Sequence, residues 1–130
     1  MDTNVLASGM LSARGAPAGI LNLVVNGDII LVLDTRIYDE YADVLRREKF
    51  AFPKNAVDEI LAFIQREGLL VTPSPASCML PDPGDLPFAE AALHTRVPVV
   101  TGNARHFRGS GADVITPAEF LEKHRLDYRL

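Results

Sequence analysis

Short apolar runs that alternate with helix-like segments constrain the fold of this chain more than any other feature. Four such runs are predicted to be strands, at residues 29–33, 69–72, 97–101 and 113–116. The first run is uninterrupted and lies between Asp28 and Asp34, as is typical of a strand that is buried on both faces. Strands separated by helices predict an α/β sandwich with a mainly parallel sheet and helices on both faces.

The segments between these runs have helical patterns. Helices are predicted at residues 17–27, from Asp34 or Thr35 to about 47, and at 55–67, 85–95 and 117–123. The segment 55–67 is amphipathic, since its apolar residues recur at helical spacing and Gly68 ends it. Four prolines between residues 73 and 84 predict a loop. No repeat or linker divides the 130 residues, so residues 1–130 are predicted to form a single domain.

Composition and charge narrow the class of protein. With 48% hydrophobic and 23% charged residues, the chain has the composition of a soluble globular domain. A net charge of −4 argues against binding nucleic acid through a broad basic surface, but it allows an acidic site that holds cations. The single Cys78 cannot form an internal disulfide, and neither a membrane-spanning run nor a secretory signal is expected. We therefore expect a cytoplasmic protein.

Glu40 is the candidate site residue with the best support from pattern alone. It lies within the apolar stripe that Ile37, Tyr41 and Val44 form on the predicted helix. A carboxylate on such a stripe needs a partner, and a metal ion is one solution. The alternative is a carboxylate at the edge of the stripe that reaches water or an arginine, and this helix by itself favours that alternative.

Four further residues are weak candidates when each is taken alone. Asp85 begins a helix, where a capping role is common, and Asp82 beside Pro83 suits a turn. Asn103 follows a strand and could adopt a left-handed turn conformation. Asp2, near the terminus, indicates nothing without the others.

Together these residues point to a cation site. Ligand sites in parallel sheets form beyond the carboxyl ends of the strands, where three carboxylates and a carboxamide can converge. Such a cluster repels itself unless cations neutralise it, and oxygen ligands suit Mg²⁺ or Mn²⁺. Two ions about 4 Å apart can activate water and stabilise the leaving oxygen in phosphodiester cleavage. No spacing of Cys and His predicts zinc, and no glycine-rich nucleotide-binding loop follows a strand.

Five segments of the chain occur in the order expected of PIN domains. They lie at residues 2–6, 40–50, 82–88, 100–107 and 116–121. The chain most resembles the bacterial branch described as toxin components of toxin–antitoxin pairs (VapC-like). This resemblance implies a metal-dependent endoribonuclease on a parallel sheet, often a homodimer, that is restrained by a cognate antitoxin protein.

The resemblance also assigns roles by position. Asp2, Glu40 and Asp85 match the three acidic catalytic metal ligands, and Asn103 matches the fourth position. Many PIN domains have Asp at that fourth position, and an Asn attracts a second cation less because its oxygen is neutral. Asp82 is an auxiliary ligand candidate.

The substrate-binding assignments concern residues beside these ligands. Thr101 is expected to orient a water or a phosphate, and Asn4 to brace the loop of Asp2. Thr3 is expected to make only local hydrogen bonds. Arg105 and His106 are the expected RNA contacts, with a packed turn residue as the alternative for His106.

The position of Asp2 raises a difficulty for the expected fold. PIN domains have their first aspartate at the end of a central strand, whereas here only Met1 precedes it. The first central strand is therefore expected to be missing or truncated, leaving a slot that is empty, filled by another segment or filled by a partner chain. Unpaired strand edges beside the slot predict a destabilised, association-prone domain.

Two other functions stay open. A catalytically impaired PIN-like domain that only binds nucleic acid or a partner protein is favoured somewhat by Asn103 and by the missing strand. A metal-dependent phosphatase of another α/β family is less well supported, because residues 2–4 lack the paired aspartates of such a nucleophile motif.

Overall fold

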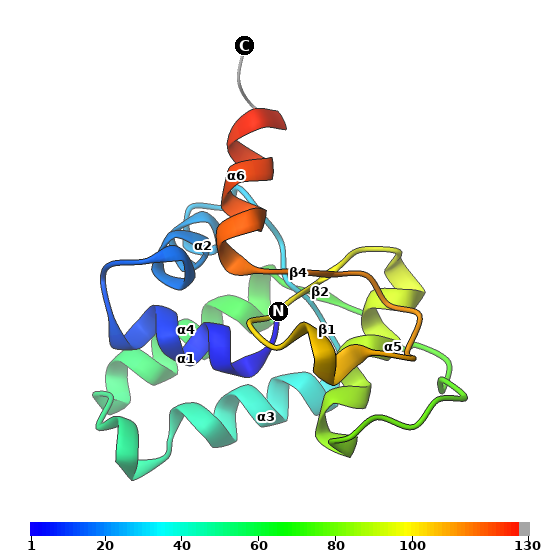
Figure 1. The fold of residues 1–130 in the computed structure, drawn as a ribbon. Helices are drawn as coiled ribbons and strands as arrows, with labels where there is room; N and C mark the ends of the chain where they lie inside the picture. Colours follow the sequence, from blue (N-terminus) through cyan, green and yellow to red (C-terminus); the bar gives the residue numbers. More distant parts are fainter. Residues whose placement is uncertain (128–130) are drawn as a thin grey trace.

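The computed structural model describes residues 1–127, which form helices joined by very short strands (Figure 1). The α-helices are α1 (Thr3–Leu11), α2 (Ala16–Val25), α3 (Thr35–Leu45), α4 (Lys54–Glu67), α5 (Leu86–Thr95) and α6 (Pro117–Asp127). The strands are β1 (Val32–Leu33), β2 (Leu69–Leu70), β3 (Val99–Val100) and β4 (Val114–Ile115). Three single turns of 3₁₀ helix are η1 (Glu48–Phe50), η2 (Pro83–Asp85) and η3 (Ala104–Phe107).

The strands pair in parallel, as the sequence predicts. Strand β1 pairs with β2, with Val32 opposite Leu69, and β3 pairs with β4, with Val99 opposite Val114. Within residues 1–127 these pairs are two separate two-stranded sheets, and they do not form the single central sheet of the predicted sandwich. The α/β class is therefore confirmed, and the continuous sheet is not observed.

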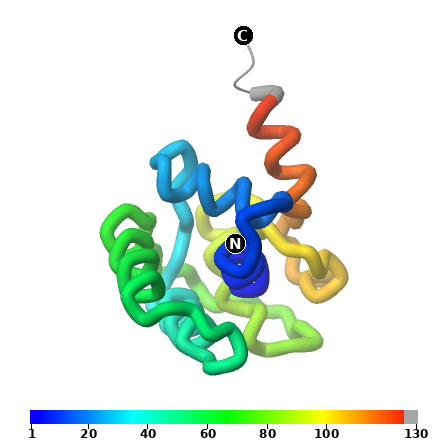
Figure 2. The backbone as a smooth tube through the Cα atoms, turned by 90° about the vertical axis from the view of Figure 1, so that its left-hand side faces the viewer, coloured from blue at the N-terminus to red at the C-terminus, as the bar shows by residue number. Residues whose placement is uncertain are grey.

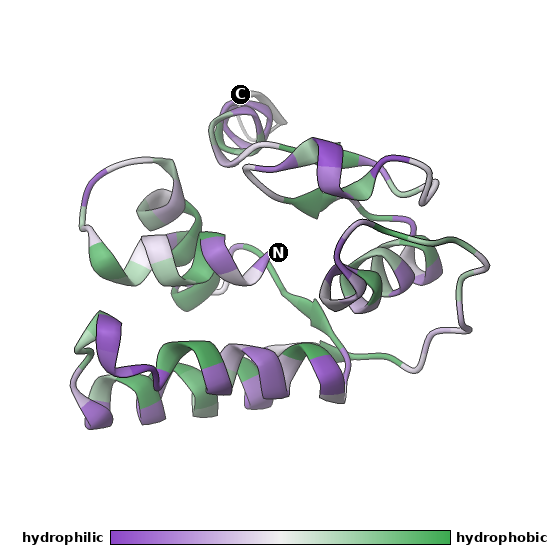
Figure 3. Ribbon diagram, turned by 60° about the horizontal axis from the view of Figure 1, so that its bottom comes forward, coloured by the Kyte–Doolittle hydropathy of each residue, from purple (hydrophilic) through white to green (hydrophobic). Residues whose placement is uncertain are grey.

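All four predicted strands exist, but each is shorter than its apolar run. In the described chain each strand is paired with a single neighbouring strand. Leu31, just before β1, still takes part in the pairing, since its carbonyl accepts from the Leu69 amide at 2.8 Å. Ile30, one residue earlier, is 66% exposed. In Figure 3 the segment that leads into β1 is hydrophobic along its length.

Helix α1 is not predicted by the apolar pattern. It begins directly after Asp2, whose side chain accepts a hydrogen bond from the Asn4 amide and so caps the helix. Val5, Leu6 and Ala7 are buried. The described chain thus begins with a helix, and β1 is its first strand. Figures 1 and 2, drawn at right angles to each other, both place the N-terminus near the centre of the molecule.

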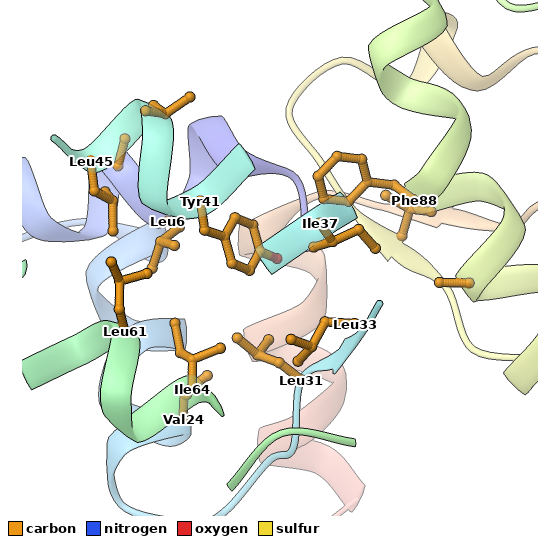
Figure 4. Close-up of a cluster of buried hydrophobic side chains, with 14 of the residues drawn as sticks. Leu6, Val24, Leu31, Leu33, Ile37, Tyr41, Leu45, Leu61, Ile64 and Phe88 are labelled. Carbon is orange, nitrogen blue, oxygen red and sulfur yellow. The ribbon is translucent and has the colours of Figure 1, made fainter. Parts of the chain in front are cut away.

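The other helices agree closely with the sequence pattern. Asp34 caps α3 by accepting from the Ile37 amide at 3.0 Å. The stripe of Ile37, Tyr41 and Val44 is buried, and the Tyr41 and Phe88 rings pack with their centroids 6.2 Å apart, so both aromatic residues belong to the core (Figure 4).

Helix α6 begins at Pro117, as expected, but it extends beyond the predicted residue 123 to Asp127. The Glu119 amide donates to the Thr116 hydroxyl, and the Thr116 amide donates to the Glu119 carboxylate, which is a capping box. None of the helices in the described chain combines the length and the hydrophobicity that crossing a bilayer requires.

Candidate active site

Asp2 is held rigidly between β3 and α1. Its amide donates to the carbonyl of Val100 at 2.8 Å, and its Oδ2 accepts from the hydroxyl of Thr101 at 2.8 Å. Its Oδ1 accepts from the backbone amide of Asn4 at 3.4 Å. The predicted bracing by Asn4 is thus made by the backbone, while the Asn4 side chain is exposed.

Thr101 connects two of the predicted site residues. Its hydroxyl donates to Asp2 and accepts from the Asn103 amide at 3.0 Å, and its side chain is fully buried. The hydroxyl proton is thus directed to Asp2, and the predicted contact with a water or a phosphate stays a prediction. Thr101 therefore positions Asp2 and the backbone of Asn103.

The prediction for Thr3 is wrong. Its hydroxyl donates to the Glu40 carboxylate across 37 positions of sequence, and the Thr3 side chain is buried. An interaction between α1 and α3 cannot be inferred from the local sequence, since it depends on how the two helices pack. Glu40 therefore has a buried hydroxyl as its partner, and the described contacts include no arginine bound to it.

Asp85 has the least satisfied carboxylate of the group. It lies where η2 meets α5, yet its side chain makes no capping hydrogen bond, contrary to the simplest expectation. Its Oδ2 is buried without a hydrogen-bond partner among the described residues. Burial raises the pKa of Asp85 to about 6, with further increases from the carboxylates of Asp2, Asp82 and Glu40 and a decrease from His106. Asp2, Glu40 and Asp85 therefore share one electrostatic region.

The same two carboxylates act on a neighbouring phenol. Burial, followed by the negative charges of Asp2 and Glu40, raises the pKa of Tyr41 far above its ordinary value. The Tyr41 hydroxyl donates to the carbonyl of Met1 at 2.5 Å. Tyr41 thus stays protonated and fixes the backbone just before Asp2.

The segment that follows β3 brings further polar groups to Asp85. The Asn103 carbonyl accepts from the His106 amide at 3.0 Å, and His106 Nδ1 lies 3.5 Å from Asp85 Oδ2. Asn103 has φ −127°, so the left-handed conformation considered from the sequence is wrong. Arg105 is exposed beside them.

Asp82 lies at the exposed edge of the group. Its Oδ1 accepts from the Gly84 amide at 2.9 Å, which is the turn contact expected of an Asp before Pro83. Its charge nevertheless raises the pKa of Asp85, so it remains near enough to influence a cation there.

These residues fit a hard cation by their chemistry. The side chains offer only oxygen atoms, and the buried, unpartnered Oδ2 of Asp85 is an atom whose charge a cation would stabilise. Within the described part of the chain, however, no three His, Cys, Asp or Glu side chains are close enough to hold one ion together. Joint coordination of one ion by these described carboxylates would therefore require side-chain movement.

A second buried polar group was not predicted from the sequence. Arg36 donates to Asp34 at 2.5 Å and to Glu90 at 2.8 Å, and Glu90 also accepts from the Ala76 amide at 2.6 Å. Both carboxylates are buried. The sequence pattern does not single out Glu90, because it lies outside the apolar stripe of Phe88, Ala89, Ala92 and Leu93 on the predicted helix. This group ties α3, α5 and the loop before η2 together.

Comparison with known protein families identifies the family of the chain. A family model described as the PIN domain matches residues 1–105, a range that includes Asp2, Glu40, Asp85 and Asn103. No curated protein and no solved structure matches the chain.

Proposed function

Because the chain belongs to the PIN-domain family, whose members are generally metal-dependent nucleases, we propose that it is an endoribonuclease that hydrolyses RNA phosphodiester bonds. The observation that carries the proposal is the buried Oδ2 of Asp85, which lacks a hydrogen-bond partner among the described residues and belongs to a carboxyl group with a raised pKa. Bound Mg²⁺ or Mn²⁺, two ions in the proposed mechanism, would activate water and stabilise the leaving oxygen.

The chain's own residues have distinct roles in this proposal. Asp2, Glu40 and Asp85 hold the cations, and Asn103 adds a neutral oxygen. Thr101 orients the Asp2 carboxylate through its hydroxyl. The exposed guanidinium of Arg105 is available to contact a phosphate.

His106 has a separate role beside the proposed cation site. Its imidazole Nδ1 lies 3.5 Å from Asp85 Oδ2, and a positive charge on this ring lowers the pKa of that carboxyl. A protonated His106 would therefore keep Asp85 ionised while the RNA binds.

The proposed biological setting is a bacterial toxin–antitoxin pair in the cytoplasm. The support is the order of the five PIN-like segments in the sequence. The partners would be RNA, a cognate antitoxin protein and a second copy of the chain in a homodimer.

A second candidate function is a PIN-like domain that binds nucleic acid or a partner protein without cleaving RNA. The observation that favours this second function is the arrangement of the carboxylates of Asp2, Glu40 and Asp85. Thr3 and Thr101 occupy oxygens of Glu40 and Asp2, and no three acidic side chains of the described residues converge on one point.

Cleavage of single-stranded RNA by the purified chain with Mn²⁺ tests the proposal. Glu40→Gln keeps an acceptor for Thr3, and Asp85→Asn keeps the shape of the side chain, so neither should disturb the fold. Each should lower the rate by more than the roughly 10- to 100-fold that loss of an outer-shell partner costs. Asp39→Asn, an exposed neighbour on α3, is the matched control and should be fully active.

The results separate the two candidate functions. Cleavage that survives both Glu40→Gln and Asp85→Asn would show that another site, or a contaminant, is responsible. RNA binding without cleavage by the unaltered chain would favour the second candidate. Gain of cleavage in Asn103→Asp would then trace the defect to the neutral fourth ligand.

A further inference from the structure

A pocket of about 460 Å³ lies beside the start of α3, and its lining includes none of the four candidate cation ligands. Its volume falls within the roughly 300–1,000 Å³ of pockets that hold small organic ligands. The polar side chains that line it include Arg36, Asp34 and Glu90. The apolar ones include Pro73, Pro75 and Leu86. The pocket thus combines apolar surface with one group of charged side chains.

Arg36 is the group through which this pocket can bind a ligand. A guanidinium carries five N–H donors in one plane. Nε and Nη2 donate to Asp34 and Nη1 donates to Glu90, so three of these donors are used among the described residues. One donor remains on Nη1 and one on Nη2, and the Arg36 side chain is 48% exposed. A ligand in the pocket can therefore accept from the guanidinium.

The carboxylates that bind Arg36 are themselves held in place. Asp34 also accepts from the Ile37 amide at 3.0 Å, and Glu90 accepts from the Ala76 amide at 2.6 Å. Both carboxylates are buried, so a ligand meets the guanidinium before it meets them. The orientation of the guanidinium is thus fixed before a ligand binds, which lowers the entropic cost of binding.

The charge of this group selects the chemistry of the ligand. Two carboxylates outnumber one guanidinium, so the net charge is negative and a phosphate or another anion would be repelled. A neutral ligand with two neighbouring acceptor atoms can use the remaining donors without this repulsion. Guanine has such a pair in O6 and N7, which is the base edge that arginine contacts most often. Adenine and the pyrimidines do not present two acceptors on the corresponding edge.

The pocket lies close to the candidate cation ligands. Leu86, in its lining, directly follows Asp85. Glu40 lies four residues after Arg36 on α3, so the two side chains are neighbours on one side of the helix, about one turn or roughly 5 Å apart. Figure 1 shows that α3 begins beside α5, the two helices that Arg36 and Glu90 join. An RNA with a phosphate at the cation site can therefore place a neighbouring base in the pocket.

We propose, on the basis of the proposed function, that this pocket binds a guanine base next to the scissile phosphate of the RNA. Arg36 donates to O6 and N7 of the base, and Pro73 and Leu86 contact the rest of the ring system. Contacts to bases give sequence specificity, whereas contacts to phosphates give position only. The chain therefore cleaves RNA beside a guanosine.

Binding of free nucleosides tests the pocket without any cleavage. In the metal-free protein, guanosine should cause saturable shifts of the Leu86 methyl signals in NMR spectra. Adenosine, and 7-deazaguanosine, which lacks the N7 acceptor, should bind at least about 5-fold more weakly, the lower end of the discrimination by an arginine–guanine pair. Inosine, which keeps O6 and N7, should bind like guanosine. Equal affinity for these nucleosides would overturn the proposal.

Two substitutions change the pocket in different ways. Thr35→Trp places an indole in the pocket, and Arg36→Lys keeps a cation between the carboxylates but removes the planar set of donors. Both should abolish the preference for guanosine, and Thr35→Trp still tests the pocket if Arg36→Lys does not fold. Ser74→Trp is the matched control, since Ser74 is exposed in the same region but lies outside the lining. An equal loss in Ser74→Trp and Thr35→Trp would contradict binding in the pocket.

Sequencing the fragments of a random RNA pool cut in the presence of Mn²⁺ tests the role in cleavage. The unaltered chain and Ser74→Trp should cut at a fixed position relative to guanosine. Thr35→Trp should still cut RNA, but without this preference.

The two experiments separate the pocket from the proposed function. Guanosine binding by a chain that cuts no RNA would support the pocket and argue against the proposed function. Cleavage without guanosine binding would overturn the pocket and leave the proposed function intact. Shifts of the Leu86 methyl signals by Nα-acetylarginine amide in place of guanosine would indicate a basic protein segment as the occupant, and would also overturn the proposal.

Discussion

At the scale of single residues, Asp85 has the most unusual environment in the candidate site. Its Oδ2 is buried near the negative charges of Asp2 and Glu40, and its pKa is raised to about 6 from an ordinary value of 3.8. The folded protein therefore binds more protons than the unfolded chain between these two pH values. By linkage, the stability of the metal-free protein should fall as the pH rises through this window.

The first prediction follows from the direction of this pH dependence. With a chelator present, the Tm of the unaltered chain should decrease as the pH rises from about 4 to about 6. The Tm of Asp85→Asn should change less over the same pH range. The measurement is limited to pH values up to about 6. Between about pH 6 and pH 8 the Met1 amine, whose pKa is lowered by burial, has the opposite effect and makes stability rise with pH. Thermal unfolding monitored by circular dichroism measures both variants.

Cation binding completes this prediction. At pH 7, Mn²⁺ should raise the Tm of the unaltered chain and leave that of Asp85→Asn unchanged, since a ligand stabilises only the state that binds it. Asp39→Asn is the control, because its carboxylate is exposed on α3. An Asp85→Asn protein with an undiminished Mn²⁺ response would remove Asp85 from the cation site.

Thr101 provides a second prediction at this scale. Thr101→Val keeps the shape of the side chain but removes the hydroxyl that donates to Asp2 and accepts from Asn103. Leaving a buried carboxylate oxygen unsatisfied should cost about 1–3 kcal/mol of unfolding free energy. Urea denaturation measures this loss. Thr72→Val, at an exposed threonine, should change stability little.

Cleavage kinetics separate a positioning role of Thr101 from a purely structural one. The assay is run at a temperature well below the Tm of Thr101→Val. If Thr101 orients Asp2, this variant should need a higher Mn²⁺ concentration than the unaltered chain for half-maximal RNA cleavage. An unchanged Mn²⁺ dependence would limit Thr101 to a structural role.

At the scale of elements, Arg36 joins the start of α3 to α5. The Arg36 side chain is 48% exposed, while the carboxylates of Asp34 and Glu90 that it binds are buried. Hydrogen bonds to both carboxylates raise the pKa of Arg36, with Asp34 the largest contributor. Removing the guanidinium would leave two buried charges close together without a cation.

The third prediction is that Arg36→Ala destabilises the chain by about 1–3 kcal/mol, the range for leaving buried polar groups unpaired. Water that reaches the half-exposed site should keep the loss below that of a fully buried pair. Arg66→Ala is the matched control, since its ion pair with Glu67 is exposed on both sides. Equal unfolding free energies for the two variants would contradict a structural role of the Arg36 group.

At the scale of the whole molecule, the two separate strand pairs leave apolar residues in contact with solvent. Ile30, Leu69 and Leu70 are 66%, 51% and 64% exposed, and all three lie on or beside the β1–β2 pair. Exposed apolar strand edges favour association between copies. The association expected from the sequence stays a prediction, and these exposed residues are where we expect the contact to form.

The fourth prediction concerns this location. The chain should associate in a concentration-dependent manner, and Leu70→Lys should shift it toward monomer while changing stability by no more than about 0.5 kcal/mol. Sedimentation velocity over a range of concentrations measures the effect. Met79→Lys, at a loop residue that is 96% exposed, should leave association unchanged. A monomer at all concentrations would contradict the prediction.

The sequence by itself determined the order of the α-helices and strands from α2 onward, and its resemblance to PIN domains named the candidate ligands. Helix α3 was predictable because Asp34 caps it and because Ile37, Tyr41 and Val44 recur at helical spacing. These signals act within a few residues of the chain, so they can be inferred without knowing the fold. The metal-binding roles of Asp2, Glu40, Asp85 and Asn103 stay predictions.

The tertiary structure alone decided which groups meet. The hydroxyl of Thr3 binds Glu40, and Arg36 binds Glu90, across long stretches of sequence. It also decided that the strands form two pairs with a cavity between them. Hydrogen bonds between distant residues and the filling of space depend on how helices and strands pack against one another, and no local periodicity encodes that packing.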